Sequence, residues 1–151
     1  MSKALQSAKY VNAIPPAAIL DDASATAVAV NTQGYAQANF LISLGATDIA
    51  MTALKVQESD DDSSYADVTG AIFGTSADPT GTTSSLPSAT DDNKVFGIFV
   101  DLKGRKKYLK LVATFGNGTA GGYCSAICVL TQGSVQNHTA AGLNVGNYLV
   151  V

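Results

Sequence analysis

Short stretches in which apolar and polar residues alternate recur along the chain of 151 residues, separated by turn-forming residues. A period of two is typical of strands that bury one face, and no segment keeps the 3.6-residue period of a long helix. The pattern predicts eight strands, at Lys9–Ile14, Thr26–Asn31, Ala36–Ser43, Asp48–Gln57, Tyr65–Ile72, Lys94–Asp101, Tyr108–Phe115 and Gly122–Leu130. We therefore expect one all-β domain over residues 1–151, an antiparallel β-sandwich or jelly-roll-like barrel with extended terminal arms.

The clearest alternation lies in Tyr108–Phe115, where every second residue is apolar. Leu109, Leu111, Ala113 and Phe115 share one face of this strand and are expected to point into the core. Two other runs, Val95–Val100 and Ala126–Leu130, are apolar on both faces, which is typical of central strands and of contact surfaces.

Turn chemistry marks the connections between the strands. The acidic run from Glu58 to Ser64 joins two alternating segments and predicts a turn between strands, while Asp101–Gly104 and Gly116–Gly122 are predicted to close hairpins. The long polar stretch Gly74–Asn93 contains Pro and Gly and is either a mobile surface loop or a contact segment.

Both chain ends leave a choice open. Residues 1–16 are interpreted as an N-terminal arm and residues 134–151 as a C-terminal arm or final strand. The last five residues, Asn147–Val151, are mostly apolar, which does not favour an end that dangles in water. Each end is expected to pair with the domain's own sheet or to reach a neighbouring chain.

Charge and composition narrow the functional classes. Charged residues make up 14% of the chain, the net charge is −3, and Arg105 is the single arginine, which argues against nucleic-acid binding. We find neither the apolar core of a signal peptide nor a stretch long enough to span a membrane, so we expect the protein to stay on the cytosolic side with no membrane partner. Cys124 and Cys128 are then expected to be reduced, since four residues of extended strand separate them by roughly 13 Å.

Candidate catalytic and metal-binding residues are sparse. The only imidazole, His138, stands among polar residues of the C-terminal stretch without a nucleophile motif, so we expect no enzyme activity and no cofactor. The acidic run suggests a Ca²⁺ loop, but the positions that an EF-hand fills with Gly and Glu hold Tyr65 and Ala71. The favoured interpretation is a solvated turn that guards the sheet edge, with no bound metal.

A basic cluster follows the Asp101–Gly104 turn. It consists of Lys103, Arg105, Lys106, Lys107 and Lys110. This cluster is either a docking patch for an acidic surface or a soluble turn with charged strand ends, and the small contribution of exposed ion pairs favours the second interpretation.

Three segments together resemble a known group of proteins. Leu54–Gly70, Asn31–Tyr35 and Leu102–Lys110 are similar to segments of small β-rich structural proteins from the head-gene clusters of tailed bacteriophages, some of which are capsid decoration, or cement, proteins. The resemblance implies a dimer or trimer, made in the host bacterial cytoplasm, that binds the exterior of the mature capsid. It would bridge neighbouring copies of the major capsid protein.

The residues expected to contact partners lie in the two arms, the long loop and the basic cluster. They are Tyr10, Val11, Ile14, Pro79, Leu86, Pro87, Lys103, Arg105, Lys107, Leu143, Tyr148, Leu149 and Val150. The alternative function is a head-fibre or tail-associated module that binds host glycans through Tyr65, Tyr123 and Tyr148, although the chain lacks Trp.

Overall fold

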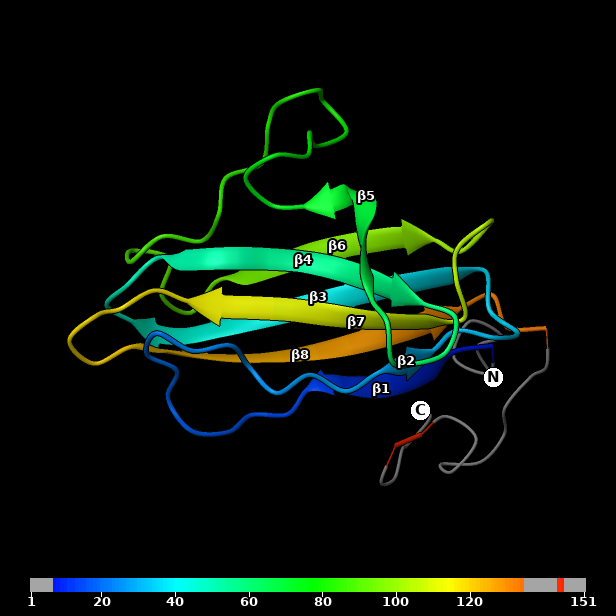
Figure 1. Ribbon diagram of the computed structural model, residues 1–151, viewed down its shortest axis with the longest axis horizontal. Helices are drawn as coiled ribbons and strands as arrows, with labels where there is room; N and C mark the ends of the chain where they lie inside the picture. Colours follow the sequence, from blue (N-terminus) through cyan, green and yellow to red (C-terminus); the bar gives the residue numbers. More distant parts are fainter. Residues whose placement is uncertain (1–6, 135–143, 146–151) are drawn as a thin grey trace, which may run out of the picture.

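The computed structural model describes residues 7–134 and 144–145, which form two four-stranded antiparallel sheets packed face to face (Figure 1). Sheet A has the order β1-β8-β3-β6, and sheet B has the order β2-β7-β4-β5. In chain order the strands are β1 Lys9–Ile14, β2 Val30–Asn31, β3 Gln37–Thr47, β4 Met51–Ser59, β5 Ala66–Ile72, β6 Val95–Asp101, β7 Tyr108–Phe115 and β8 Gly122–Thr131. The predicted all-β sandwich is confirmed.

Alternating side chains from both sheets fill the core between them. On β7, the four residues predicted to point inward, from Leu109 to Phe115, are at most 1% exposed. Sheet A contributes Phe40 and Ile42 of β3, whose side chains are completely buried. This inward face is continuous across the sandwich and supplies the main hydrophobic stabilisation of the fold.

Five strands begin and end within one residue of their predicted limits, β3 ends four residues later than predicted, and the starts of β2 and β4 differ for identifiable reasons. The stretch before β2 is not a regular strand because it crosses between the sheets: Ala25 N–H donates to Ala113 O of sheet B at 2.9 Å, and Val28 N–H donates to Ala13 O of sheet A at 2.8 Å. β4 begins three residues later than predicted, because Thr47 Oγ1 donates to Ile49 O at 2.7 Å and closes a turn there.

Two of the predicted hairpins are wrong. The Asp101–Gly104 turn follows β6, which pairs with β3, and leads to β7, which pairs with β4 in the other sheet. The Gly116–Gly122 connection likewise leads from β7 in sheet B to β8 in sheet A. By contrast, the acidic turn joins β4 and β5, which do pair with each other, as predicted.

For residues 9–14 of the N-terminal arm, the structure selects one of the two predicted alternatives. Residues 9–14 form β1, which pairs with β8 along one edge of sheet A, and Ile14 is 2% exposed. This segment therefore completes the domain's own sheet. Residues 1–6, 135–143 and 146–151 lie outside the described residues, so the predicted C-terminal arm falls almost wholly outside them.

Candidate functional site

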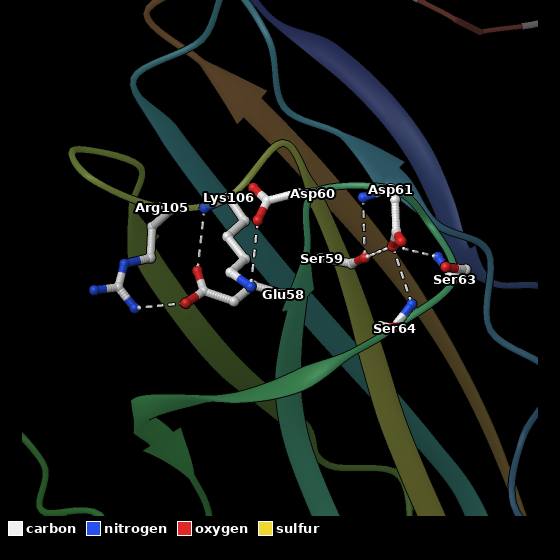
Figure 2. Close-up of polar contacts among 8 residues, drawn as sticks. All are labelled: Glu58, Ser59, Asp60, Asp61, Ser63, Ser64, Arg105 and Lys106. Carbon is white, nitrogen blue, oxygen red and sulfur yellow. Dashed lines mark hydrogen bonds and ion pairs between the residues drawn. The ribbon is translucent and has the colours of Figure 1, made fainter.

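The acidic turn is organised around the carboxylate of Asp61 (Figure 2). This carboxylate accepts hydrogen bonds from Ser59 Oγ at 2.9 Å and from the backbone N–H groups of Ser63 and Ser64 at 3.0 Å each. These hydrogen bonds, the one from Ser64 first, hold the pKa of Asp61 well below its usual range because they favour the charged form. The carboxylate is thus used to close the turn.

The neighbouring carboxylates meet the basic connection between β6 and β7 (Figure 2). Glu58 accepts from Arg105 Nη1 at 3.5 Å and from the backbone N–H of Lys106 at 3.2 Å, and Asp60 lies 3.3 Å from Lys106 Nζ. Two residues of the acidic turn are therefore paired with two residues of the basic cluster within one chain. Within residues 7–134 and 144–145, no group of three or more His, Cys, Asp or Glu is arranged to hold a metal ion.

Some of the remaining basic residues and predicted tyrosines contact other side chains of the chain, and others are exposed to solvent. Lys110 Nζ lies 5.0 Å above the ring of Tyr65, whose hydroxyl donates to Asp62, so this ring is already covered on one side. Lys107 Nζ lies 4.9 Å from the ring centroid of its neighbour Tyr108, while Lys103 is exposed. Tyr123 is 47% exposed, and Tyr148 lies outside the described residues.

A different surface stands out on the outer side of sheet A. Its largest exposed apolar side chains are Phe99 at 70%, Val95 at 65%, Ile127 at 49% and Leu41 at 42%. With the partly exposed Tyr10 and Val129 they form what we call the sheet A face: Tyr10, Leu41, Val95, Phe99, Ile127 and Val129. None of these six residues is charged.

The strand register makes the sheet A face continuous. Leu41 is paired with Ile127 on one side and with Gly97 on the other, and the next row contains Tyr10, Val129, Asn39 and Phe99. The one amide in this row is satisfied within the sheet, because Asn39 Nδ2 donates to Val129 O at 3.1 Å. The row of Leu41 ends on β1 at the exposed Asn12, which pairs with Ile127, so the apolar side chains form a continuous patch with one exposed amide at the β1 edge.

The sheet A face has relief. A Cβ added to Gly97 would lie 2.9 Å from Phe99 Cζ, so the glycine leaves room for the aromatic ring to fold over the strand. Beside it lies a shallow apolar hollow of about 370 Å³, whose lining includes Tyr10, Leu41, Val95 and Ile127. The face therefore presents an exposed aromatic ring that lies over Gly97, next to a depression.

The outer side of sheet B has the opposite character. Lys55 Nζ lies 2.8 Å from Asp67 Oδ2, and Gln57 Nε2 donates to Asp67 Oδ1 at 2.7 Å. The hydrogen bond from Lys55, and then that from Gln57, lower the pKa of Asp67. One outer face of the sandwich is thus charged and hydrogen-bonded, and the other is apolar. The apolar outer face of sheet A is the one suited to an apolar partner.

The predicted contact residues fall into distinct environments. Tyr10 belongs to the sheet A face, and Val11 packs against the core. Two predictions are corrected, because the side chains of Ile14 and Pro87 are buried inside the chain and cannot reach a partner. Leu86 also packs against the core, as part of the connection that projects beside β5 (Figure 1).

Pro79 is exposed in that connection and lines a hollow of about 520 Å³ between β5 and β6, together with Phe99. Of the other predicted contacts, Leu143, Tyr148, Leu149 and Val150 lie outside the described residues, as does His138. Residue 144 is described, and Asn144 Nδ2 donates to Tyr10 O at 2.7 Å.

Sequence reasoning did not single out Leu41, Phe99 or Ile127 as contact residues. A signal was present for two of them, because Phe99 and Ile127 belong to the runs that are apolar on both faces. Leu41 lies in a similar apolar run, Phe40-Leu41-Ile42, in which the two flanking residues point inward.

The two cysteines are free and buried. Burial raises the pKa of Cys124 to about 11 and that of Cys128 to about 12. Both groups are therefore thiols at neutral pH and poor nucleophiles.

Comparison with models of known protein families gave no match, and a search of curated proteins gave none either. No helix that could span a membrane occurs among the described residues.

Proposed function

We propose that this chain is a virion structural protein that binds the outer surface of the mature capsid of a tailed phage. It staples neighbouring copies of the major capsid protein and so stabilises the shell. The observation that carries the proposal is the sheet A face, because a contiguous exposed apolar surface on a small sandwich is typical of a protein whose surface is completed by other subunits. The resemblance of the acidic turn and its neighbouring segments to head-cluster proteins supplies the capsid context.

The stapling mechanism is multivalent. An oligomer that touches several capsid subunits gains affinity through effective concentration even where each contact is weak. If the protein binds only the expanded shell, its binding free energy adds to that state alone and opposes shell disruption. The exposed loop around Pro79 and the chain ends are the segments we assign to the shell, while the charged outer side of sheet B faces solvent.

Purified virions provide the test of this function. The ratio of this chain to the major capsid protein, measured by quantitative gel or mass spectrometry, is expected to correspond to hundreds of copies per particle. A handful of copies, located at the tail or at one vertex, would contradict capsid decoration. Together with reproducible binding of the purified chain to a glycan array, that result would favour the adhesion module instead.

A further inference from the structure

We infer that the sheet A face is where two copies of this chain associate, sheet against sheet, about a two-fold axis. The inference rests on the proposed function, which requires an oligomer, and it names the surface through which the copies in that oligomer associate. It requires no capsid, so it can be tested on the purified chain alone.

Charge favours a second copy as the occupant. None of the six residues of the sheet A face is charged, whereas Glu58 with Arg105 and Asp60 with Lys106 form ion pairs within the chain elsewhere. A charged partner would lose hydration on this surface without gaining an ion pair. A second, identical uncharged surface loses no charge hydration on binding. A two-fold axis places the sheet A faces of the two copies against each other.

The size of the face also fits a dimer. Four strands about 4.8 Å apart and roughly seven residues long, at about 3.3 Å per residue, cover roughly 450 Å² in projection. This projection is a lower bound for the accessible area that such a face can bury, and standard stable interfaces bury about 800 Å² per partner. Two sheets of a sandwich pack about 10 Å apart in the same aligned manner.

The strand register makes the face complementary to itself. A two-fold axis parallel to the strands and midway between β8 and β3 exchanges the columns of the sheet but keeps the rows. It would place Leu41 of one copy against Ile127 of the other, because these residues occupy the same row on the two central strands. In the adjacent row it would place the exposed Phe99 against Tyr10, which lines the hollow.

Sedimentation velocity over a concentration series tests the inference, with Leu41→Lys as the disrupting variant. Leu41 and Val28 are equally exposed, at 42%, but Val28 lies outside the sheet A face, so Val28→Lys is a matched control for the added charge. We expect wild type and Val28→Lys to form dimers and Leu41→Lys to dissociate at least tenfold more readily. Phe99→Ser, at an exposed position on an edge strand, is a second disrupting variant should Leu41→Lys fold poorly.

Three results would overturn the inference. The first is a wild-type monomer throughout the concentration range. The second is a dimer that Leu41→Lys and Phe99→Ser leave as stable as the control does. The third is a monomer that dimerises only after removal of residues 146–151, which would assign the face to the chain's own end. A monomer that still decorates capsids would refute the dimer and leave the proposed function standing. A dimer that is absent from virions would support the dimer and refute the proposed function.

Discussion

Substituting alanine for Gly122 tests how closely the two sheets approach each other at one end of the sandwich. Gly122 opens β8 in sheet A, and the ring of Phe115 from sheet B lies directly against it. An added Cβ would overlap Cε1 of that ring and would lie only 2.7 Å from both Phe115 Cδ1 and Thr47 Oγ1. Gly122 also exchanges two backbone hydrogen bonds of 2.8 Å with Leu20, which limit its freedom to move away.

Two opposing effects set the expected size of the change. Overpacking of a well-filled core costs about 1–3 kcal/mol. Alanine restricts the unfolded chain more than glycine does, which raises the free energy of unfolding by about 0.4–1 kcal/mol. We therefore expect Gly122→Ala to lower the free energy of unfolding by about 1–2 kcal/mol. Adding Phe115→Leu removes the overlapping ring edge, so the double variant should be at least about 0.5 kcal/mol more stable than the sum of the single effects predicts.

Urea unfolding followed by far-ultraviolet circular dichroism is the suitable assay, since the chain has no Trp. Gly45→Ala is a matched control at the same end of sheet A, because its added Cβ would meet one atom, Tyr123 Cβ, at 3.1 Å and the next at 3.8 Å. We expect this control to cost clearly less than Gly122→Ala. Equal effects of the two alanines, or strict additivity of Gly122→Ala and Phe115→Leu, would refute the packing argument.

Three further predictions concern titration, thiol reactivity and the apolar face. The hydrogen bond from Lys94 is the main cause that lowers the pKa of Asp91 from 3.8 to about 2. The charged form of Asp91 therefore stabilises the folded chain above pH 3.8, and this contribution is lost as the pH falls toward 2. Asp91→Asn should flatten that part of an acid-unfolding curve. Cys124 and Cys128 should resist a thiol reagent at neutral pH until urea unfolds the chain, and rapid labelling of the native protein would contradict their burial. Phe99→Ala should lower the free energy of unfolding of dilute protein by at most about 1.5 kcal/mol, because the ring is 70% exposed, and a larger loss in urea titration would mean that the ring serves the fold.

The strands could be predicted from the sequence because alternation reports burial locally. β7 has its predicted limits and its predicted inward face, since each residue from Tyr108 to Phe115 alternates between core and surface. The assignment of strands to sheets could not be predicted in the same way. Turn residues such as those of Asp101–Gly104 serve equally well in a hairpin and in a connection between sheets, and only the pairing of β6 with β3 and of β7 with β4 decides between the two.

The candidate surface was only partly predictable for a related reason. A run that is apolar on both faces has the same sequence whether its second face is covered or open, so Ile127 could not be distinguished from a buried residue of a central strand. β8 is indeed central, yet Ile127 is 49% exposed, because no layer described in the structure covers the outer side of sheet A. The pairing of Glu58 with Arg105 joins residues 47 positions apart and depends on the fold.

The central claim is that this chain acts by association with other protein subunits, and a binding isotherm on expanded capsids from which the protein has been removed tests it most directly. The account predicts that the wild-type chain and Val28→Lys reoccupy the shells at a fixed ratio to the major capsid protein, and that Leu41→Lys binds more weakly because a monomer loses avidity. Shells that stay bare at saturating concentrations of the wild-type chain would contradict the claim.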